Sequence, residues 1–258
     1  MFSPDLDEYL EHCRPPIEVF DKIYVMGDIH GKAPLALTQL ANKPNKDKIA
    51  VILLGDAGLN YYGHRRDDYF KEYMNNIGVK FYCVRGNHEK RPEKVDGIER
   101  VFDCQVENYV YAEPHFPNLR YLIDGYEYMF NGLSCLSIGG AYSVDKWYRL
   151  RNGWMWHKSE QLSEQEMEDI TNKWQDQFVN VVLSHTCPFD WQPTDLFIPE
   201  VDQTTVDNTM ELWMNKLKDE VLWDKWLFGH FHQTRDIIEG RVKMLSNDIL
   251  LDLEEWYE

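Results

Sequence analysis

The feature that most constrains the fold is a set of five apolar segments, each followed directly by a short polar cluster. Strands are predicted over Lys22–Met26, Ile49–Leu54, Lys80–Arg85, Phe178–Leu183 and Trp226–Phe228. The clusters that follow them are Gly27-Asp28-Ile29-His30-Gly31, Gly55-Asp56-Ala57-Gly58, Gly86-Asn87-His88-Glu89, Ser184-His185 and Gly229-His230-Phe231-His232. Because the carboxyl ends of strands in an α/β sheet line one crevice, we expect these five clusters to meet.

Segments between and after these strands indicate the fold class. Helices are predicted over Pro34–Asn42 and Asp67–Ile77, and strands that alternate with helices are typical of a largely parallel α/β sheet. The second half contains a predicted hairpin, since Asn131-Gly132 suits a type I′ turn between two apolar runs. Its other predicted elements are a helix capped by Ser163 and Glu166, a helix over Val206–Leu217 and a strand over Val242–Leu245. No linker or repeat divides residues 1–258, so we expect one domain.

Charge and cysteine content argue against several classes of protein. The chain has 27 basic and 44 acidic residues, a net charge of −17, which argues against long nucleic acid or an anionic membrane as a partner. The five cysteines include no CxxC pair, which argues against a zinc ribbon or a secreted disulfide framework and favours reduced core residues: Cys13, Cys83, Cys104, Cys135 and Cys187. The start of the sequence lacks a signal-peptide pattern, so a cytoplasmic location is expected.

The residue types in the five clusters point to metal chemistry. Together they offer two aspartates, one asparagine and several imidazoles, and five of the nine histidines fall within them. Mixed oxygen and nitrogen donors suit manganese, iron or zinc better than calcium. Manganese is our first expectation.

The ordered series GDxHG, GDxG, GNHE, a single His and GHxH resembles the calcineurin-like metallophosphoesterase superfamily, from Asp28 to His232. The resemblance implies an α/β fold of four layers, in which two mixed β-sheets pack face to face between helices. It also implies two divalent metal ions. The first would be held by Asp28, His30, Asp56 and His232, and the second by Asp56, Asn87, His185 and His230. His88 matches the catalytic histidine of the family.

By this resemblance, a metal-bound hydroxide attacks the phosphorus of a phosphate ester in line, and His88 is the candidate general acid. The motifs favour a phosphomonoesterase that acts on a small phosphate ester or a phosphoprotein. A phosphodiesterase acting on cyclic or short linear nucleotides is the alternative, because the aromatic segment Trp147–Trp156 could stack on a base. A third possibility is a metal-binding scaffold without activity.

The sequence departs from the family's Ser/Thr phosphatase branch after Asp56. That branch has an aspartate that orients the catalytic histidine and an arginine that grips phosphate, whereas Leu59 and Asn60 occupy these positions here. Glu89 is the candidate for the orienting role. The candidates for phosphate binding are Arg65, Arg66, Arg149 and Arg151.

Overall fold

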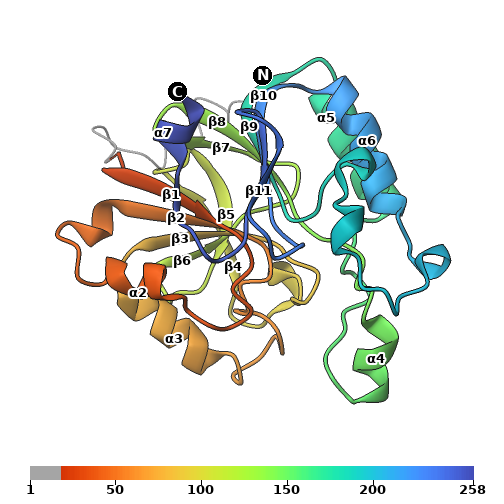
Figure 1. Cartoon of the computed structure of the whole chain (residues 1–258). Coiled ribbons are helices and arrows are strands. Elements are labelled where there is room, and N and C mark those ends of the chain that lie inside the picture. The colour runs from red at the N-terminus through yellow and green to blue at the C-terminus, as the bar shows by residue number, and fades with distance from the viewer. Residues whose placement is uncertain (1–18) are drawn as a thin grey trace.

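In the computed structural model, which describes residues 19–258, the strands form two mixed sheets (Figure 1). The first sheet has the order β13 (Leu251–Asp252), β1 (Lys22–Met26), β2 (Ile49–Leu54), β3 (Lys80–Val84), β6 (Leu119–Tyr121), β5 (Asn108–Ala112) and β4 (Glu99–Asp103). The second has the order β11 (Arg235–Ile238), β12 (Val242–Met244), β10 (Leu222–Phe228), β9 (Phe178–Ser184), β8 (Leu133–Ile138) and β7 (Glu127–Phe130). The four strands β1, β2, β3 and β6 are parallel, as are β12, β10, β9 and β8, and the remaining pairings are antiparallel.

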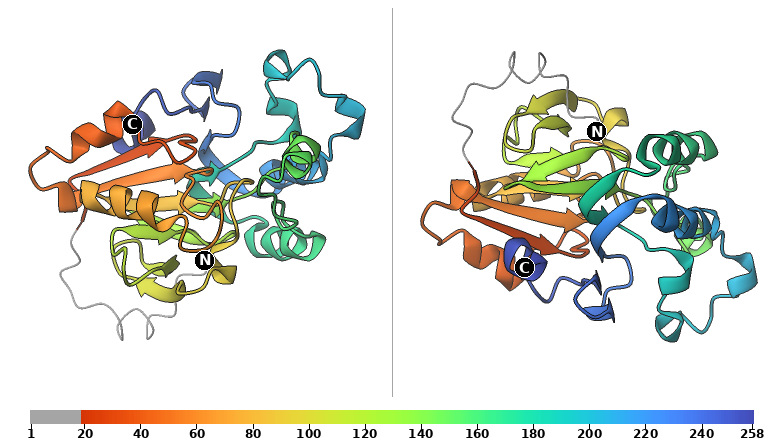
Figure 2. Two further views of the ribbon diagram at one scale, coloured as in Figure 1. Left: turned by 90° about the horizontal axis from the view of Figure 1, so that it is seen from below. Right: turned by 90° about the horizontal axis from the view of Figure 1, so that it is seen from above.

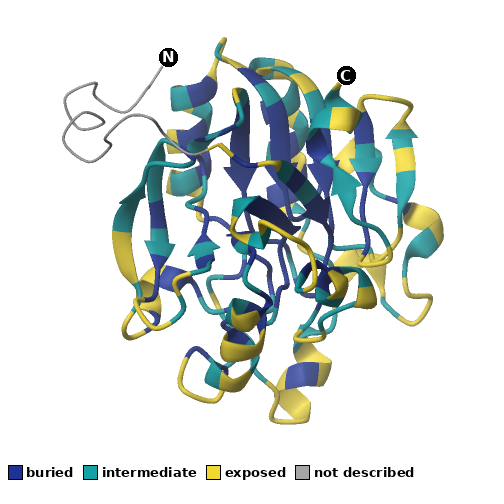
Figure 3. Ribbon diagram, turned by 90° about the vertical axis from the view of Figure 1, so that its left-hand side faces the viewer, coloured by how far each residue is buried: buried dark blue, intermediate teal, exposed yellow. Residues whose placement is uncertain are grey.

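Helices cover the outer face of each sheet, which gives four layers. Figures 1 and 2 show α2 (Leu35–Leu40) and α3 (Asp68–Ile77) against the first sheet, and α5 (Glu164–Trp174) and α6 (Thr209–Glu220) against the second. Every residue of β2 is buried, and its side chains alternate between two cores. Ile52 and Leu54 face the core between the sheets, whereas Val51 and Leu53 face the core under α2 and α3. The dark central strands of Figure 3 mark these cores, and the expected four-layer fold is confirmed.

The predictions that rest on turn residues and helix-capping residues are confirmed. Asn131 and Gly132 both have positive φ, 50° and 88°, as a type I′ turn requires. Ser163 and Glu166 form the expected capping box at the start of α5. Strand β10 begins earlier than predicted, at Leu222, because the charged residues Asp224 and Lys225 interrupt its apolar run.

Some elements were not predicted from the sequence: the short strands β4, β5, β6, β11 and β13, and the helices α4 (Lys146–Arg151) and α7 (Leu253–Tyr257). Cys83, Cys135 and Cys187 are free and buried, as expected. Cys104 is disulfide-bonded, so the expectation of a reduced core cysteine is wrong for this residue, and Cys13 lies outside the described residues. Within residues 19–258, no helix is both long enough and apolar enough to cross a bilayer.

Candidate metal centre and catalytic site

The five strand-end clusters meet at one edge of the two sheets. The first three follow β1, β2 and β3, and the other two follow β9 and β10. His30 Nε2 lies 2.9 Å from His232 Nε2, and His185 Nε2 lies 2.7 Å from Asn87 Oδ1. Close approaches also link Asp28 with His230 and His185, and Asp56 with His30 and His185. The structure therefore brings together all seven residues predicted to bind metal.

Close backbone packing makes this convergence possible. A Cβ atom added to Gly55 would lie 2.1 Å from Nδ1 of His185, and one added to Gly86 would lie 1.9 Å from Oδ1 of Asp56. Four of the seven predicted ligands have left-handed backbone conformations, with φ between 44° and 69°: His30, Asp56, His230 and His232. Such conformations are unfavourable for residues other than glycine, and they cluster at functional sites, where the surrounding structure holds them in place.

The two aspartates present carboxylate oxygens to the centre of the cluster. Asp28 Oδ1 accepts the backbone N–H of His230 at 2.7 Å, but Asp28 Oδ2 is buried and has no hydrogen-bond partner. Asp56 Oδ1 accepts the backbone N–H of His88 at 2.9 Å, and its Oδ2 lies 3.7 Å from His185 Nε2. The groups near Asp28 Oδ2 are His232 Nε2 at 3.5 Å and His30 Nε2 at 3.8 Å. A buried carboxylate oxygen that faces imidazole nitrogens is a donor set that fits a bound metal.

Ionisation states also suit metal binding. Burial opposes ionisation of Asp56, but electrostatic attraction to neighbouring imidazoles, that of His88 above all, lowers the pKa of its carboxyl on balance. Burial and the neighbouring His185 lower the pKa of His230 to about 3. At neutral pH the carboxylate is therefore charged and the His230 ring is neutral, which is the state in which each binds a metal ion.

The pair formed by His185 and Asn87 gives an independent argument for a cation. His185 Nδ1 lies 2.7 Å from the carbonyl of Leu54, which can only accept, so Nε2 of a neutral ring carries a lone pair. The Nδ2 group of Asn87 donates to Ser143 Oγ at 2.8 Å, which turns Oδ1 towards the same Nε2. Two acceptors 2.7 Å apart repel each other unless a proton or a metal ion lies beside both.

Two residues that the sequence analysis did not single out orient Asn87. Ser143 Oγ donates to Glu160 Oε2 at 2.5 Å and accepts from Asn87, and Trp156 Nε1 donates to the same Glu160 oxygen at 2.8 Å. Ser143, Glu160 and Asn87 are all buried. The loop after β8 carries Ser143, and the sequence signal for this loop was the glycine pair Gly139-Gly140.

His88 lies between two carboxylates at the edge of the cluster. Its Nδ1 is 3.5 Å from Asp56 Oδ2, and its Nε2 is 3.7 Å from Asp145 Oδ1. Burial opposes protonation of His88, but the charge of Asp56 and the adjacent Asp145 carboxylate raise its pKa on balance. His88 therefore has the surroundings of a general acid.

Asp145, and not Glu89, lies beside the His88 ring. Asp145 directly precedes α4, and its Oδ2 is paired with Arg149 Nε at 3.2 Å. Both N–H groups of Gly58 and Leu59 donate to Glu89 Oε1, at 2.8 and 3.0 Å, so Glu89 ties the loop after β2 to the loop after β3. Burial, together with the charge of Asp56, raises the pKa of Glu89 to about 7.

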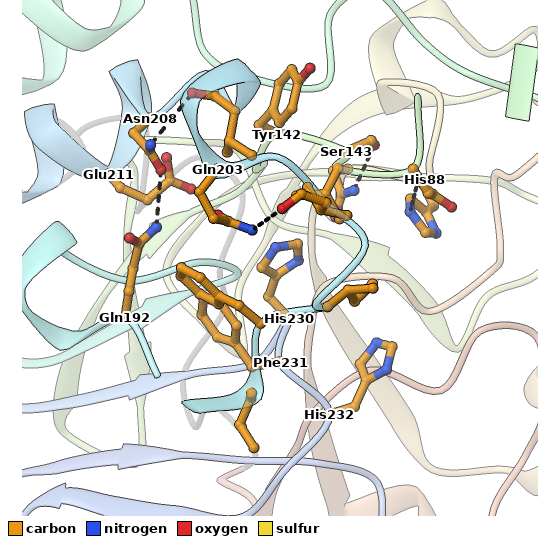
Figure 4. A pocket seen from close by; sticks show the side chains of 18 of the residues that line it. His88, Tyr142, Ser143, Gln192, Gln203, Asn208, Glu211, His230, Phe231 and His232 are labelled. Carbon is orange, nitrogen blue, oxygen red and sulfur yellow. Dashed lines mark hydrogen bonds and ion pairs between the residues drawn. The ribbon is translucent and has the colours of Figure 1, made fainter. Parts of the chain in front are cut away.

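A cavity of about 290 Å³ opens beside the cluster, and Figure 4 shows His88, His230 and His232 in its wall. Arg65, Arg66 and Arg151 are exposed and do not line it. Arg149 does not line it either, because its buried guanidinium pairs with Asp145 and donates to the Met155 carbonyl at 3.0 Å. The structure thus leaves all four predicted phosphate-binding arginines outside the cavity wall.

A family match agrees with this geometry. Residues 21–234 match the family described as calcineurin-like phosphoesterase. Among curated proteins, none matches the chain. One similar solved structure is the phosphopantetheinyl hydrolase (PptH) from Mycobacterium tuberculosis, with 14% sequence identity and a TM-score of 0.47 over 89% of each chain. From the match over residues 21–234, the chain belongs to the calcineurin-like phosphoesterase family, whose members are metal-dependent hydrolases.

Proposed function

We propose that this chain is a phosphomonoesterase that requires two divalent metal ions. The observation that carries the proposal is the position of His88, which lies between Asp56 and Asp145 and lines a cavity that also reaches the metal-ligand cluster. A phosphate placed on the metal ions would therefore have a proton donor on one side and space for its organic group beyond.

Asp28, His30, Asp56 and His232 would hold one ion, and Asp56, Asn87, His185 and His230 would hold the other. Two such ions polarise the phosphoryl oxygens and lower the pKa of a water molecule. The chain itself fixes the ligands: the Leu54 carbonyl orients His185, and Ser143 orients Asn87. His88 would give its proton to the oxygen of the leaving group, and the Asp145 carboxylate would keep the imidazolium stable and correctly oriented.

Manganese is our proposal for the ions, with iron or zinc as alternatives. Support comes from the mixture of two carboxylates, one amide and four imidazoles among the seven ligands, since imidazole suits transition metals and oxygen donors suit manganese. The proposed substrate is a small phosphate ester or a phosphoprotein, in a cytoplasmic setting.

A phosphodiesterase is the second candidate, and one specific observation favours it. Neither lysine nor arginine is among the described residues that line the cavity. A diester carries one negative charge on its phosphate, whereas a monoester carries up to two, so a diester needs less compensation from the protein.

Parallel assays of p-nitrophenyl phosphate and bis-p-nitrophenyl phosphate with added Mn²⁺, and with EDTA as control, test the proposal. Faster, chelator-sensitive cleavage of the monoester is the expected result. Faster cleavage of the diester would replace the first candidate with the second. No cleavage of either, by protein shown to contain two metal ions per chain, would contradict both.

A further inference from the structure

The cavity extends well beyond the metal-ligand cluster, and its far wall is apolar. This wall is built mainly from the segment between β9 and α6, together with the loop after β8. The apolar and aromatic side chains that line it are Tyr142, Val144, Leu196, Phe197, Ile198, Val201, Val206 and Phe231. The neutral amides Gln192, Gln203 and Asn208 lie beside them, together with the carboxyl group of Glu211 (Figure 4). Such a wall favours an uncharged organic group over an ionic one.

One buried acceptor in this wall has no partner. Glu211 lies in the first turn of α6 and is 4% exposed. Its Oε1 accepts a hydrogen bond from Thr186 Oγ1 at 3.0 Å, whereas its Oε2 is buried without any hydrogen-bond partner. Burial raises the pKa of the Glu211 carboxyl to about 7. In its charged form, the unpartnered Oε2 is unfavourable until a donor reaches it. Glu211 lines the cavity, so a ligand in the cavity lies next to this side chain.

We propose that this apolar half of the cavity binds the organic group of the phosphate ester, and that this group is an uncharged chain with a hydroxyl or amide N–H that donates to Glu211 Oε2. This inference rests on the proposed function, because it assigns the substrate class of the same site.

A series of phosphate monoesters tests how the length and the end group of the organic chain affect kcat/KM. With Mn²⁺-loaded protein, kcat/KM should rise roughly fourfold for each added methylene, and stop rising once the chain fills the cavity. At equal length, a hydroxyl-ended chain should exceed a methyl-ended chain by about tenfold, because its donor pairs with a buried carboxylate. Carboxylate-ended chains should be the poorest substrates. A preference for ammonium-ended chains would overturn the assignment of an uncharged group.

Glu211→Gln tests the hydrogen bond itself. The glutamine Oε1 keeps the bond from Thr186, so its Nε2 takes the place of Oε2 and presents a donor where the carboxylate presented an acceptor. Wild-type protein should prefer a hydroxyl-ended chain to a ketone-ended one, and the variant should reverse this preference. Glu220→Gln, at the opposite end of α6 and outside the cavity wall, is the matched control and should keep the wild-type preference. An unchanged preference in Glu211→Gln would contradict the inference.

Binding measurements separate failure of this inference from failure of the proposed function. Calorimetric titration with the corresponding non-hydrolysable phosphonates should show the same dependence on chain length and end group. If the phosphonates follow this pattern but no ester is hydrolysed, the cavity assignment stands and the phosphoesterase proposal fails. If p-nitrophenyl phosphate is hydrolysed but chain length and end group have no effect in either assay, the cavity assignment fails and the phosphoesterase proposal stands.

Discussion

At the scale of single residues, the carboxylate beside His88 has a testable effect on pH dependence. A general acid must be protonated, so activity should be lost as the pH rises through the pKa of His88. The Asp145 carboxylate helps to raise that pKa, so Asp145→Asn should move the alkaline limb of the kcat profile to lower pH and lower kcat by about tenfold. An alkaline limb that stays in place, at unchanged metal content, would contradict this role. Exposed Asp219, replaced in the same way, is the control.

The hydroxyl of Ser143 should control metal affinity through Asn87. Ser143→Ala removes the acceptor that fixes the Asn87 amide, so the oxygen of this amide no longer has a fixed direction. We expect the affinity for the second Mn²⁺ ion to fall by about ten- to a hundredfold in a metal titration.

Ser137→Ala is a matched control for this substitution. Ser137 is also fully buried, but its hydroxyl has no hydrogen-bond partner. Equal loss of metal affinity in both variants would show that the effect is general destabilisation and not the orientation of Asn87.

At the scale of elements, α4 holds Asp145 in place through Arg149. The buried Arg149 pairs with Asp145 within the same turn and donates to the carbonyl of Met155, which closes the loop after the helix. If Arg149 acts only through Asp145, Arg149→Met should lower kcat by about tenfold with little change in KM. Adding Asp145→Asn should then have little further effect, since the two residues form one unit. Additive effects with a raised KM would instead identify Arg149 as a direct phosphate ligand.

The same elements explain which parts of the fold and site could be predicted from sequence. Strand β2 is apolar throughout, β1 is apolar or aromatic after Lys22, and a glycine directly follows each. The limits of these strands and the ligands that follow, Asp28 and Asp56, could therefore be predicted from local patterns. Asp145, Ser143 and Glu160 carry no such pattern. They reach the site because β8 lies beside β9 in the second sheet, a tertiary arrangement that spacing along the chain does not encode. Helix α4 has only six residues, its buried side chain is the charged Arg149, and it is too short for a periodic signal.

Glu89, the candidate from the sequence for orienting His88, does not have this role in the structure. Glu89 is adjacent to His88 in sequence, but consecutive residues in a tight loop point in different directions. Its carboxylate turns inward to the N–H groups of Gly58 and Leu59, and the partner of His88 comes from a residue 57 positions later in the chain. Contacts of this kind are fixed by packing of the two sheets, which the motifs alone do not describe.

At the scale of the whole molecule, the proposed metal ligands come from both sheets, so metal binding should stabilise the entire fold. Asp28 and Asp56 follow strands of the first sheet, whereas His185 and His230 follow strands of the second. Any ion that binds the folded chain alone, at a hundred times its Kd, adds about 2.7 kcal/mol to the free energy of unfolding. For a chain of this length that corresponds to a rise in Tm of about 5–10 °C. The difference between the Tm with Mn²⁺ and the Tm with EDTA, measured by differential scanning calorimetry, checks this prediction.

Two comparisons show whether this stabilisation comes from the proposed ligand set. Calcium prefers oxygen ligands, and four of the seven side chains are imidazoles, so Ca²⁺ at the same concentration should raise Tm much less than Mn²⁺. Asp56→Asn removes the carboxylate expected to bridge both ions while keeping an oxygen for the His88 N–H. The variant should therefore fold but lose most of the Mn²⁺-dependent rise. Both proposed sites need the Asp56 carboxylate. If the Mn²⁺-dependent rise in Tm were undiminished in Asp56→Asn, the stabilising ions would therefore bind elsewhere.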